Sequence, residues 1–342
     1  MRRLLNNLFV TTEGMYLAKK GLTVDVRQNR VSRLRVPIHT LTGIICFGRV
    51  TVSPRLMELC GRRQVLISFL DQRGRFLARV HGPVSGNVLL RRTQYRQADN
   101  PVLGSEVARA IVGAKVANSR LVLQRALRDH PNLPVSELAS AIANLGALMT
   151  RLRQPCDIGG IRGLEGDGAR LYFGVFGHLI LAQKDVFSFQ NRSRRPPTDP
   201  VNALLSFLYT LLSHDVSSAL EAVGLDPAVG FLHRDRSGRP SLALDIMEEF
   251  RAFLVDRLVL SLINRQQVRA QGFRTTETGA VLMDEETRKE VLVAWQKRKQ
   301  EEIQHPFLDE KMPVGMLPFA QALLLARYLR GDLDGYPPFF WK

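Results

Sequence analysis

Short apolar runs alternate with turn residues along the first 80 positions. Runs rich in β-branched and aromatic side chains are separated by Gly14, Gly21, Asn29, Gly48 and Gly74. This spacing predicts a small all-β domain. Strands are expected over residues 7–10, 16–18, 22–26, 33–37, 41–45, 50–52, 64–69 and 75–80.

One short helix interrupts these strands. Ser53 precedes Pro54, and an apolar face follows over residues 55–60. Serine is a favoured N-cap, and proline is favoured at the first helical position. The pattern therefore predicts a helix that begins at Pro54.

Apolar residues recur at helical spacing from Asn87 onward. Segments 129–134 and 191–197 carry prolines that no helix interior tolerates. We therefore expect an α+β protein of several domains: an N-terminal all-β domain, residues 1–86, and a larger, nearly all-α domain, residues 87–342. The helices are expected over residues 89–98, 103–128, 135–152, 163–181, 201–223, 242–264, 285–302 and 316–329.

The composition excludes several classes of protein. The hydrophobic share is 45% of 342 residues, which is typical of a folded chain. The longest apolar run, residues 203–212, falls short of the roughly 20 residues that span a bilayer, and no signal peptide precedes it, so we expect a cytoplasmic protein. Cys46, Cys60 and Cys156 form no CxxC pair, which favours buried thiols over disulfides or zinc ligands.

The charge indicates a polyanionic partner. The chain has 48 basic and 32 acidic side chains, a net charge of +16, and residues 1–95 alone hold 17 basic and 4 acidic ones. Most of the bases are arginine, which binds phosphate bidentately and stacks on bases. Nucleic acid is the first candidate; a solvated basic face without a function is the alternative.

Motifs for covalent catalysis or nucleotide binding are missing. The sequence contains no GxSxG and no Walker or dinucleotide glycine pattern. Carboxylates and an imidazole in the helical half remain as candidates. Glu165 lies between glycines at the start of a predicted helix, where a carboxylate that only complements the helix dipole is the competing interpretation.

His233 follows an apolar stretch and precedes a hydrophilic turn, which indicates a pocket rim, although a lone histidine is more often a packing residue. Asp245 and Glu248 are three residues apart, so a helix would place both carboxylates on one face, where they could share a cation. A solvated acidic edge with Glu248 paired to Arg251 is the alternative. Together these oxygens and one imidazole suit Mg²⁺ or Mn²⁺.

Four motifs stand in order in this half of the chain. They are E-G-x-x-A-x-x-Y at residues 165–172, R-P-P-x-D-P-x-N-x-L-L-S-F-x-Y at 195–209, G-F-L-H followed by G-R-P-S-L-A-L-D-I-M-E-E-F-R within 230–251, and an ending that runs from L-R-G-D to Y-P-P-F over 329–339. In this order they resemble the CRISPR-associated integrase family, the adaptation endonucleases that insert new spacers into CRISPR arrays. The resemblance covers nearly the whole chain.

The resemblance implies a site and its ligands. Glu165, His233 and Glu248 would hold the metal, with Asp245 close by as a fourth catalytic residue and Asn202 a candidate for the same pocket. Glu248 is preferred to Asp245 as the ligand because its longer side chain reaches a cation held by other segments, while Asp245 is better placed to orient a ligand. Gly168 departs from the more usual small, helix-favouring residue but leaves the ligand positions intact.

The resemblance also implies a reaction and partners. The 3′-hydroxyl of a short DNA duplex would attack a phosphodiester at the edge of a CRISPR repeat, and water in its place would give nuclease activity. The implied assembly is a homodimer that joins a small ferredoxin-like CRISPR partner protein and binds double-stranded DNA. The protein would supply positioning and charge stabilisation rather than a covalent intermediate.

Two other functions fit parts of this pattern. One is a non-catalytic, basic DNA-binding scaffold whose carboxylates are structural; Mn²⁺-dependent nicking of DNA separates it from an enzyme. The other is a metal-dependent DNA-repair nuclease outside CRISPR, which a neighbouring repeat array and partner gene would exclude.

Overall fold

The computed structural model describes residues 6–71, 76–80, 82, 88–194 and 196–342. Gly74, Arg75 and Arg195, which entered the sequence predictions, lie outside this part. The chain divides into two compact units. The first contains residues 1–85, 285–301 and 313–316, and the second contains residues 86–284, 302–312 and 317–342.

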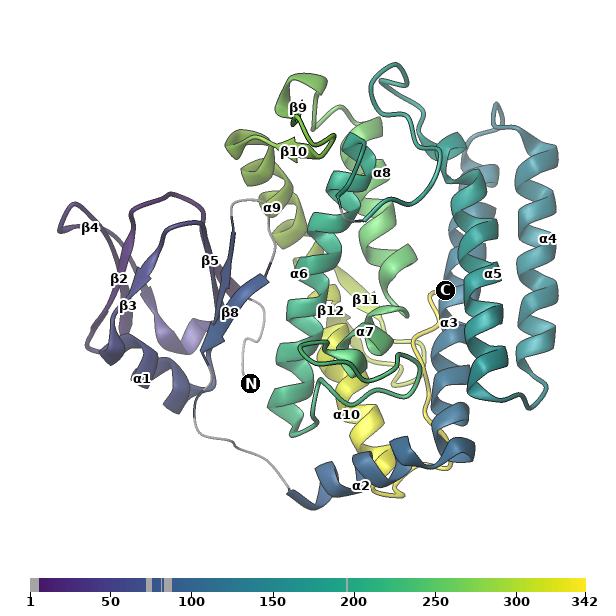
Figure 1. The fold of residues 1–342 in the computed structure, drawn as a ribbon, viewed down its shortest axis with the longest axis horizontal. Helices are drawn as coiled ribbons and strands as arrows, with labels where there is room; N and C mark the ends of the chain where they lie inside the picture. Colours follow the sequence, from purple (N-terminus) through teal and green to yellow (C-terminus); the bar gives the residue numbers. More distant parts are fainter. Residues whose placement is uncertain (1–5, 72–75, 81, 83–87, 195) are drawn as a thin grey trace. The chain divides into compact units, whose positions relative to one another are not determined.

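The described strands of the first unit form two sheets (Figure 1). In one sheet β1, β5 and β7 run parallel and β8 pairs antiparallel to β7. In the other, β4, β3 and β2 are antiparallel neighbours and β6 lies parallel to β2. The bounds are β1 Asn6–Val10, β2 Tyr16–Lys20, β3 Thr23–Gln28, β4 Val31–Pro37, β5 Leu41–Phe47, β6 Thr51–Val52, β7 Leu66–Leu70 and β8 Phe76–Val80.

Helix α1, Pro54–Arg63, packs with these strands. As the sequence predicts, it begins at Pro54, and the Ser53 hydroxyl accepts a hydrogen bond from the Leu56 amide (3.3 Å). Apolar residues of both sheets and of this helix form one core, which includes Leu17, Ile44, Leu56 and Ile67. The β-rich start of the chain is therefore confirmed, and each of the strands β1 to β8 begins and ends within two residues of its expected position.

Helix α9, Glu285–Gln300, groups with the first unit rather than with the helical unit. Its Trp295 is fully buried, and the Arg288 guanidinium lies over the Phe47 ring at 5.9 Å from the centroid. The predicted boundaries placed this helix in the C-terminal domain. The predicted boundaries missed that α9 packs with the first unit. A local sequence pattern cannot reveal a packing partner that lies more than 200 residues away.

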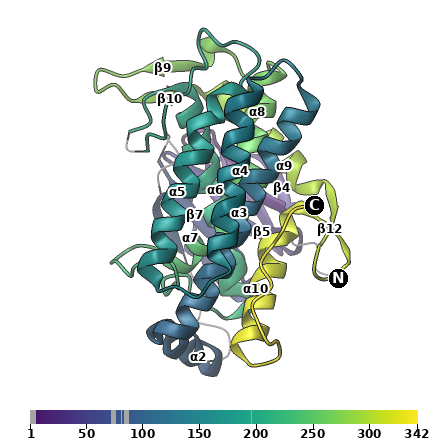
Figure 2. The same ribbon diagram turned by 90° about the vertical axis from the view of Figure 1, so that its right-hand side faces the viewer.

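Helices make up most of the second unit (Figures 1 and 2). Long helices α3, α4 and α5 lie side by side, as their mutual contacts also show. Helix α6 packs on α10 and on α7. The bounds are α2 Val88–Asp99, α3 Pro101–Asp129, α4 Val135–Leu152, α5 Ile158–Phe176, α6 Pro200–Val223, α7 Ser241–Met247, α8 Arg257–Asn264 and α10 Leu317–Leu329.

Two predicted helices need correction. Helix α5 begins five residues before its expected start, because the Asp157 carboxylate caps it by accepting the Gly160 amide (2.9 Å). Glu165 therefore lies within the helix and not in its first turn. The helix expected over residues 242–264 is broken: α7 ends at Met247, a turn follows, and a π-helical segment, Arg251–Asp256, precedes α8.

Short strands in the second half escaped prediction. Strands β9 (Phe273–Thr275) and β10 (Val281–Met283) form an antiparallel hairpin, and β11 (Glu302–Gln304) pairs with β12 (Lys311–Pro313). Three residues are too few to establish an alternating pattern. The helical unit is thus nearly, but not wholly, α-helical.

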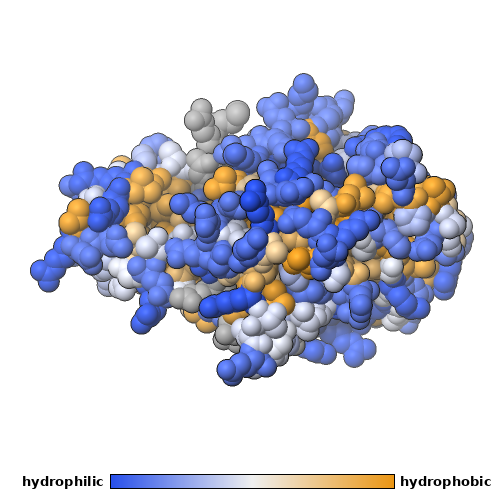
Figure 3. All heavy atoms as spheres, turned by 90° about the horizontal axis from the view of Figure 1, so that it is seen from above, coloured by the Kyte–Doolittle hydropathy of each residue, from blue (hydrophilic) through white to orange (hydrophobic). Residues whose placement is uncertain are grey.

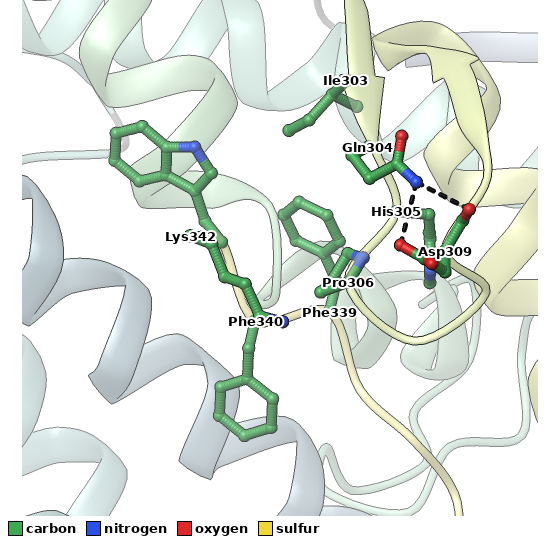
Figure 4. A pocket seen from close by; sticks show the side chains of 9 residues that line it. Ile303, Gln304, His305, Pro306, Asp309, Phe339, Phe340 and Lys342 are labelled. Atoms are coloured by element: carbon green, nitrogen blue, oxygen red, sulfur yellow. Dashed lines mark hydrogen bonds between the residues drawn. The ribbon is translucent and has the colours of Figure 1, made fainter.

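Residues 336–342 lie along α3. The Asn118 side-chain amide donates to the carbonyl oxygen of Phe339 (2.9 Å), and its oxygen accepts the Trp341 amide (2.8 Å). The Trp341 ring lies 3.9 Å from the guanidinium of Arg125 and 4.2 Å from that of Arg257. A pocket of about 180 Å³ lies beside this segment, where Gln304 donates to Asp309 (Figure 4).

Hydrophilic residues predominate on the face shown in Figure 3. Among the described residues, no helix is long and apolar enough to cross a membrane. Cys46 and Cys60 are buried as expected, and burial raises the pKa of both thiols to about 12; Cys156 is only half-buried, because it lies in the exposed segment before α5.

Candidate active site

Two carboxylates predicted from the sequence meet at one lysine. Glu165 comes from the middle of α5, Glu248 from the turn after α7, and Lys115 from α3. The Lys115 ammonium contacts Glu165 Oε1 and lies 2.8 Å from Glu248 Oε2. Three elements distant in sequence thus converge on a single cation.

Glu248 is held as an anion although it is almost fully buried, with 3% of its surface exposed. Burial acts to raise its pKa, but the positive charges of Arg251 and Lys115 outweigh that effect and lower the pKa to about 2. The Arg251 guanidinium lies 3.1 Å from Glu248 Oε1. This contact matches the alternative interpretation of the sequence, yet the carboxylate is enclosed rather than solvated.

Asp245 faces a different group of partners. Its oxygens accept the backbone amides of Phe231 (2.6 Å), Leu232 (2.9 Å) and His233 (2.9 Å), and it is fully buried. A carboxylate that accepts several backbone amides has its lone pairs committed. The two acidic side chains therefore face separate partners, because α7 ends between them.

His233 takes its orientation from Asp245. Its Nδ1 lies 2.6 Å from Asp245 Oδ1. A proton on Nδ1 that bonds the carboxylate leaves the Nε2 lone pair free for a metal or a proton, which is the usual arrangement of histidine ligands.

Gly230 makes this arrangement possible. A Cβ atom at this position would lie 2.6 Å from Asp245 Oδ2 and 2.8 Å from the backbone carbon of Ser241. Arg162 of α5 supports the same loop by donating to the Leu232 carbonyl oxygen (2.6 Å). The G-F-L-H motif is thus a glycine-dependent loop wrapped around one buried carboxylate.

A second buried network continues from Arg251. Its guanidinium lies over the Tyr209 ring at 4.8 Å, and the Tyr209 hydroxyl donates to Asp256 (2.5 Å). Burial raises the pKa of Asp256 to about 6 despite that hydrogen bond. Arg192 approaches the same ring at 5.4 Å from the basic loop before α6.

Asn202 holds that loop in place. Its oxygen accepts from the Arg192 guanidinium (2.6 Å) and the Ser193 amide (3.1 Å), and its amide group donates to the Asn191 carbonyl (2.8 Å) and to Asp199. Within the described structure it contacts none of the candidate ligands. Its placement favours a structural role at the start of α6 over one in the ligand pocket.

The donor set fits a hard divalent cation in its chemistry. Glu165 and Glu248 already enclose a positive charge, and His233 would add an imidazole nitrogen to these oxygens. In the described residues, however, no three His, Cys, Asp or Glu side chains gather at the spacing of metal ligands. The lysine ammonium occupies the space between the two carboxylates.

Sequence reasoning missed Lys115. Helix α3 buries a long apolar face, and Lys115 is the charged residue within it. A lysine in an otherwise apolar helical stripe requires a buried anion. That pattern was available in the sequence and would have indicated an acidic partner.

The chain is similar to known proteins along its whole length. Residues 8–297 match the family model described as CRISPR associated protein Cas1. The chain is 54% identical over 343 residues to a CRISPR-associated endonuclease Cas1 of Chlorobaculum tepidum, with both proteins covered completely. A second Cas1 endonuclease, from Rhodospirillum rubrum, is 53% identical over 347 residues, again across the full length of both.

A solved structure shares the fold. A casposase bound to its integration product superposes with a TM-score of 0.85 at 23% identity, covering 99% of this chain and 95% of that one.

Proposed function

Because the chain belongs to the Cas1 family of CRISPR-associated proteins, it is a CRISPR-associated endonuclease, and we propose that it integrates short DNA duplexes into a repeat array with the help of a divalent metal. The convergence of Glu165 and Glu248 on one cation position carries this proposal. We place the activity in the cytoplasm, where the DNA of a prokaryotic cell lies.

Glu165, Glu248 and the Nε2 atom of His233 are the residues we assign to Mg²⁺ or Mn²⁺. Oxygen donors with one imidazole suit such ions. When bound, the ion would supply charge neutralisation at the scissile phosphate.

The remaining residues hold these groups in position. Asp245 fixes the tautomer and orientation of His233 through its Nδ1 contact, and its burial keeps it from touching DNA. Arg251 keeps Glu248 ionised. We therefore assign Asp245 to positioning, and Glu165, His233 and Glu248 to direct contact with the cation.

The excess of arginine supports DNA binding through phosphates. We propose double-stranded DNA as the substrate, both as the incoming duplex and as the repeat, because a net charge of +16 favours a polyanion. Binding should weaken steeply with salt, since each phosphate contact releases counterions. Titrations at several salt concentrations measure this effect, and a log–log slope near zero would remove phosphate contacts as the source of affinity.

We assign the first unit to assembly, as part of a homodimer that joins a small ferredoxin-like CRISPR partner protein. Edge strand β4 supports this role, because Val31 and Leu34 are exposed apolar residues on it, and an exposed edge is normally covered or paired. Leu34→Lys should shift the protein toward monomer in light scattering, whereas Val293→Lys, at an exposed position of α9, should not. Dimers that persist in Leu34→Lys would contradict the assignment.

The decisive experiment is strand transfer. Labelled duplex with free 3′-hydroxyls, repeat-containing DNA and the partner protein should give a joined product with Mn²⁺ and none with a chelator. Nicking without joining would favour a repair nuclease, and binding without either reaction would favour a scaffold.

A further inference from the structure

Lys115 is a buried lysine whose charge is compensated by two acidic side chains. It is 8% exposed and lies among apolar residues of α3. Its ammonium contacts Glu165 and stands 2.8 Å from Glu248. These two ion pairs are what compensates the burial of its charge.

The same ammonium keeps two like charges together. Glu165 and Glu248 come from separate elements, and each would repel the other without a cation between them. Helix packing brings them close: Gly168, one turn beyond Glu165, lets α5 approach α3 so that a Cβ there would lie 3.1 Å from Val116. The carboxylate pair is therefore built to hold a cation at this point.

We propose that the Lys115 ammonium occupies the divalent-cation position when no metal is bound. A metal ion then binds Glu165 and Glu248 by displacing this ammonium. This inference rests on the proposed function, because it concerns the same two ligands. An ion that binds both carboxylates needs the space between them, and two cations in that space would repel each other. The lysine side chain must then turn away.

Exchange has two measurable consequences. Without metal, Lys115 stabilises the fold by compensating a buried carboxylate. With metal, it lowers the apparent affinity, because only the fraction of molecules with displaced lysine offers a free site. Replacing it by methionine, which keeps the length and removes the charge, should therefore destabilise the metal-free protein and tighten metal binding.

Mn²⁺ binding to the full chain, measured by electron paramagnetic resonance, tests the exchange without relying on activity. Lys115→Met should bind Mn²⁺ about tenfold or more tightly than the wild type. Its melting temperature without metal should fall, and saturating Mn²⁺ should restore most of the loss. Lys184→Met, at an exposed lysine of the same unit, is the matched control and should change neither quantity.

The outcomes separate the two proposals. If the wild type binds Mn²⁺ and Lys115→Met binds it equally or more weakly, the exchange is wrong while the metal site stands. If neither protein binds Mn²⁺, the metal site itself fails, and the exchange with it. In a protein that already carries Glu248→Gln, Lys115→Met should lower the melting temperature without metal by a smaller amount than it does in the wild type. An equal lowering would show that Lys115 acts through other contacts.

Discussion

Glu248 and Glu249 are neighbours in the chain, yet their carboxylates face opposite electrostatic environments. Glu248 meets Lys115 and Arg251 and has its pKa lowered to about 2. Among the described residues, Glu249 accepts hydrogen bonds from neutral donors: the Tyr336 hydroxyl (2.6 Å), the Phe339 amide (2.7 Å) and the Gln321 amide group (2.9 Å). Burial raises the pKa of Glu249 to about 7.

This contrast makes Glu249→Gln the control for Glu248→Gln. Glu248→Gln should abolish Mn²⁺ binding and strand transfer because it removes a proposed ligand, while DNA affinity stays within about twofold, since phosphate contacts elsewhere supply it. Glu249→Gln should retain bound Mn²⁺. Metal analysis of both purified variants gives the answer, and full Mn²⁺ occupancy in Glu248→Gln would overturn the ligand assignment.

Asp245→Asn should separate positioning from ligation. An amide can accept only through its oxygen, so it cannot serve three backbone amides and His233 together. Strand transfer should fall by about 10- to 100-fold while Mn²⁺ occupancy persists, which is the range for groups that orient a ligand. An empty metal site in this variant would make Asp245 a ligand.

The stability of the protein should depend on Glu249 between pH 4.5 and 7. A carboxyl whose folded pKa lies above its usual 4.5 stabilises the fold below pH 4.5, and this contribution is lost as pH rises through 7. A shift of that size corresponds to about 3 kcal/mol. Relative to the wild type, Glu249→Gln should gain stability as pH rises from 5 to 8; parallel melting curves across that range would contradict the shift.

Gly230→Ala should damage the site without touching a ligand. The added methyl group would lie 2.6 Å from Asp245 Oδ2, so the loop must move and the His233 contact with it. A displacement of about 1 Å can cost about 100-fold in rate. We expect a loss of that order in strand transfer, whereas Gly335→Ala, which meets open space, should be neutral. Unchanged transfer in Gly230→Ala would mean that the loop adapts.

Two glycines on α5 provide a packing test. Gly174→Ala meets open space and should stabilise the protein by about 0.5–1 kcal/mol, as expected when a helix interior loses a glycine. Gly168→Leu must displace Val116 of α3 and should destabilise it by about 1–3 kcal/mol. Chemical denaturation compares them, and equal stability would show that α3 and α5 pack less tightly than this spacing requires.

The parts of the fold that were predicted correctly follow from local sequence patterns. Helix α4 matches its expected range because Pro134 precedes an uninterrupted apolar spacing. The start of α5 was misplaced because Gly159 and Gly160 disfavour a helix, while the cap at Asp157 allows one to begin at Ile158. The short strands were missed because three residues show no alternating pattern. The packing of α9 with the first unit was missed because its partners are distant in sequence.

The site was predictable as a set of residues but not as a set of contacts. Motifs pointed to Glu165, His233, Asp245 and Glu248, yet the three-residue spacing of Asp245 and Glu248 suggested that these two acids could share a cation. Their separation arises where α7 ends, and Lys115 enters from α3 more than 100 residues earlier. Pairings across that distance follow from helix packing.

The π-helical segment Arg251–Asp256 determines the directions in which the side chains of α8 point relative to Glu248. Each residue of an α-helix turns the side-chain direction by about 100°. Deleting one residue here would rotate α8 by that angle relative to the carboxylate, turning buried Leu258, Val259 and Leu262 away from the core. Transplanting Glu248 onto another helical scaffold therefore requires copying the wide turn together with the acid.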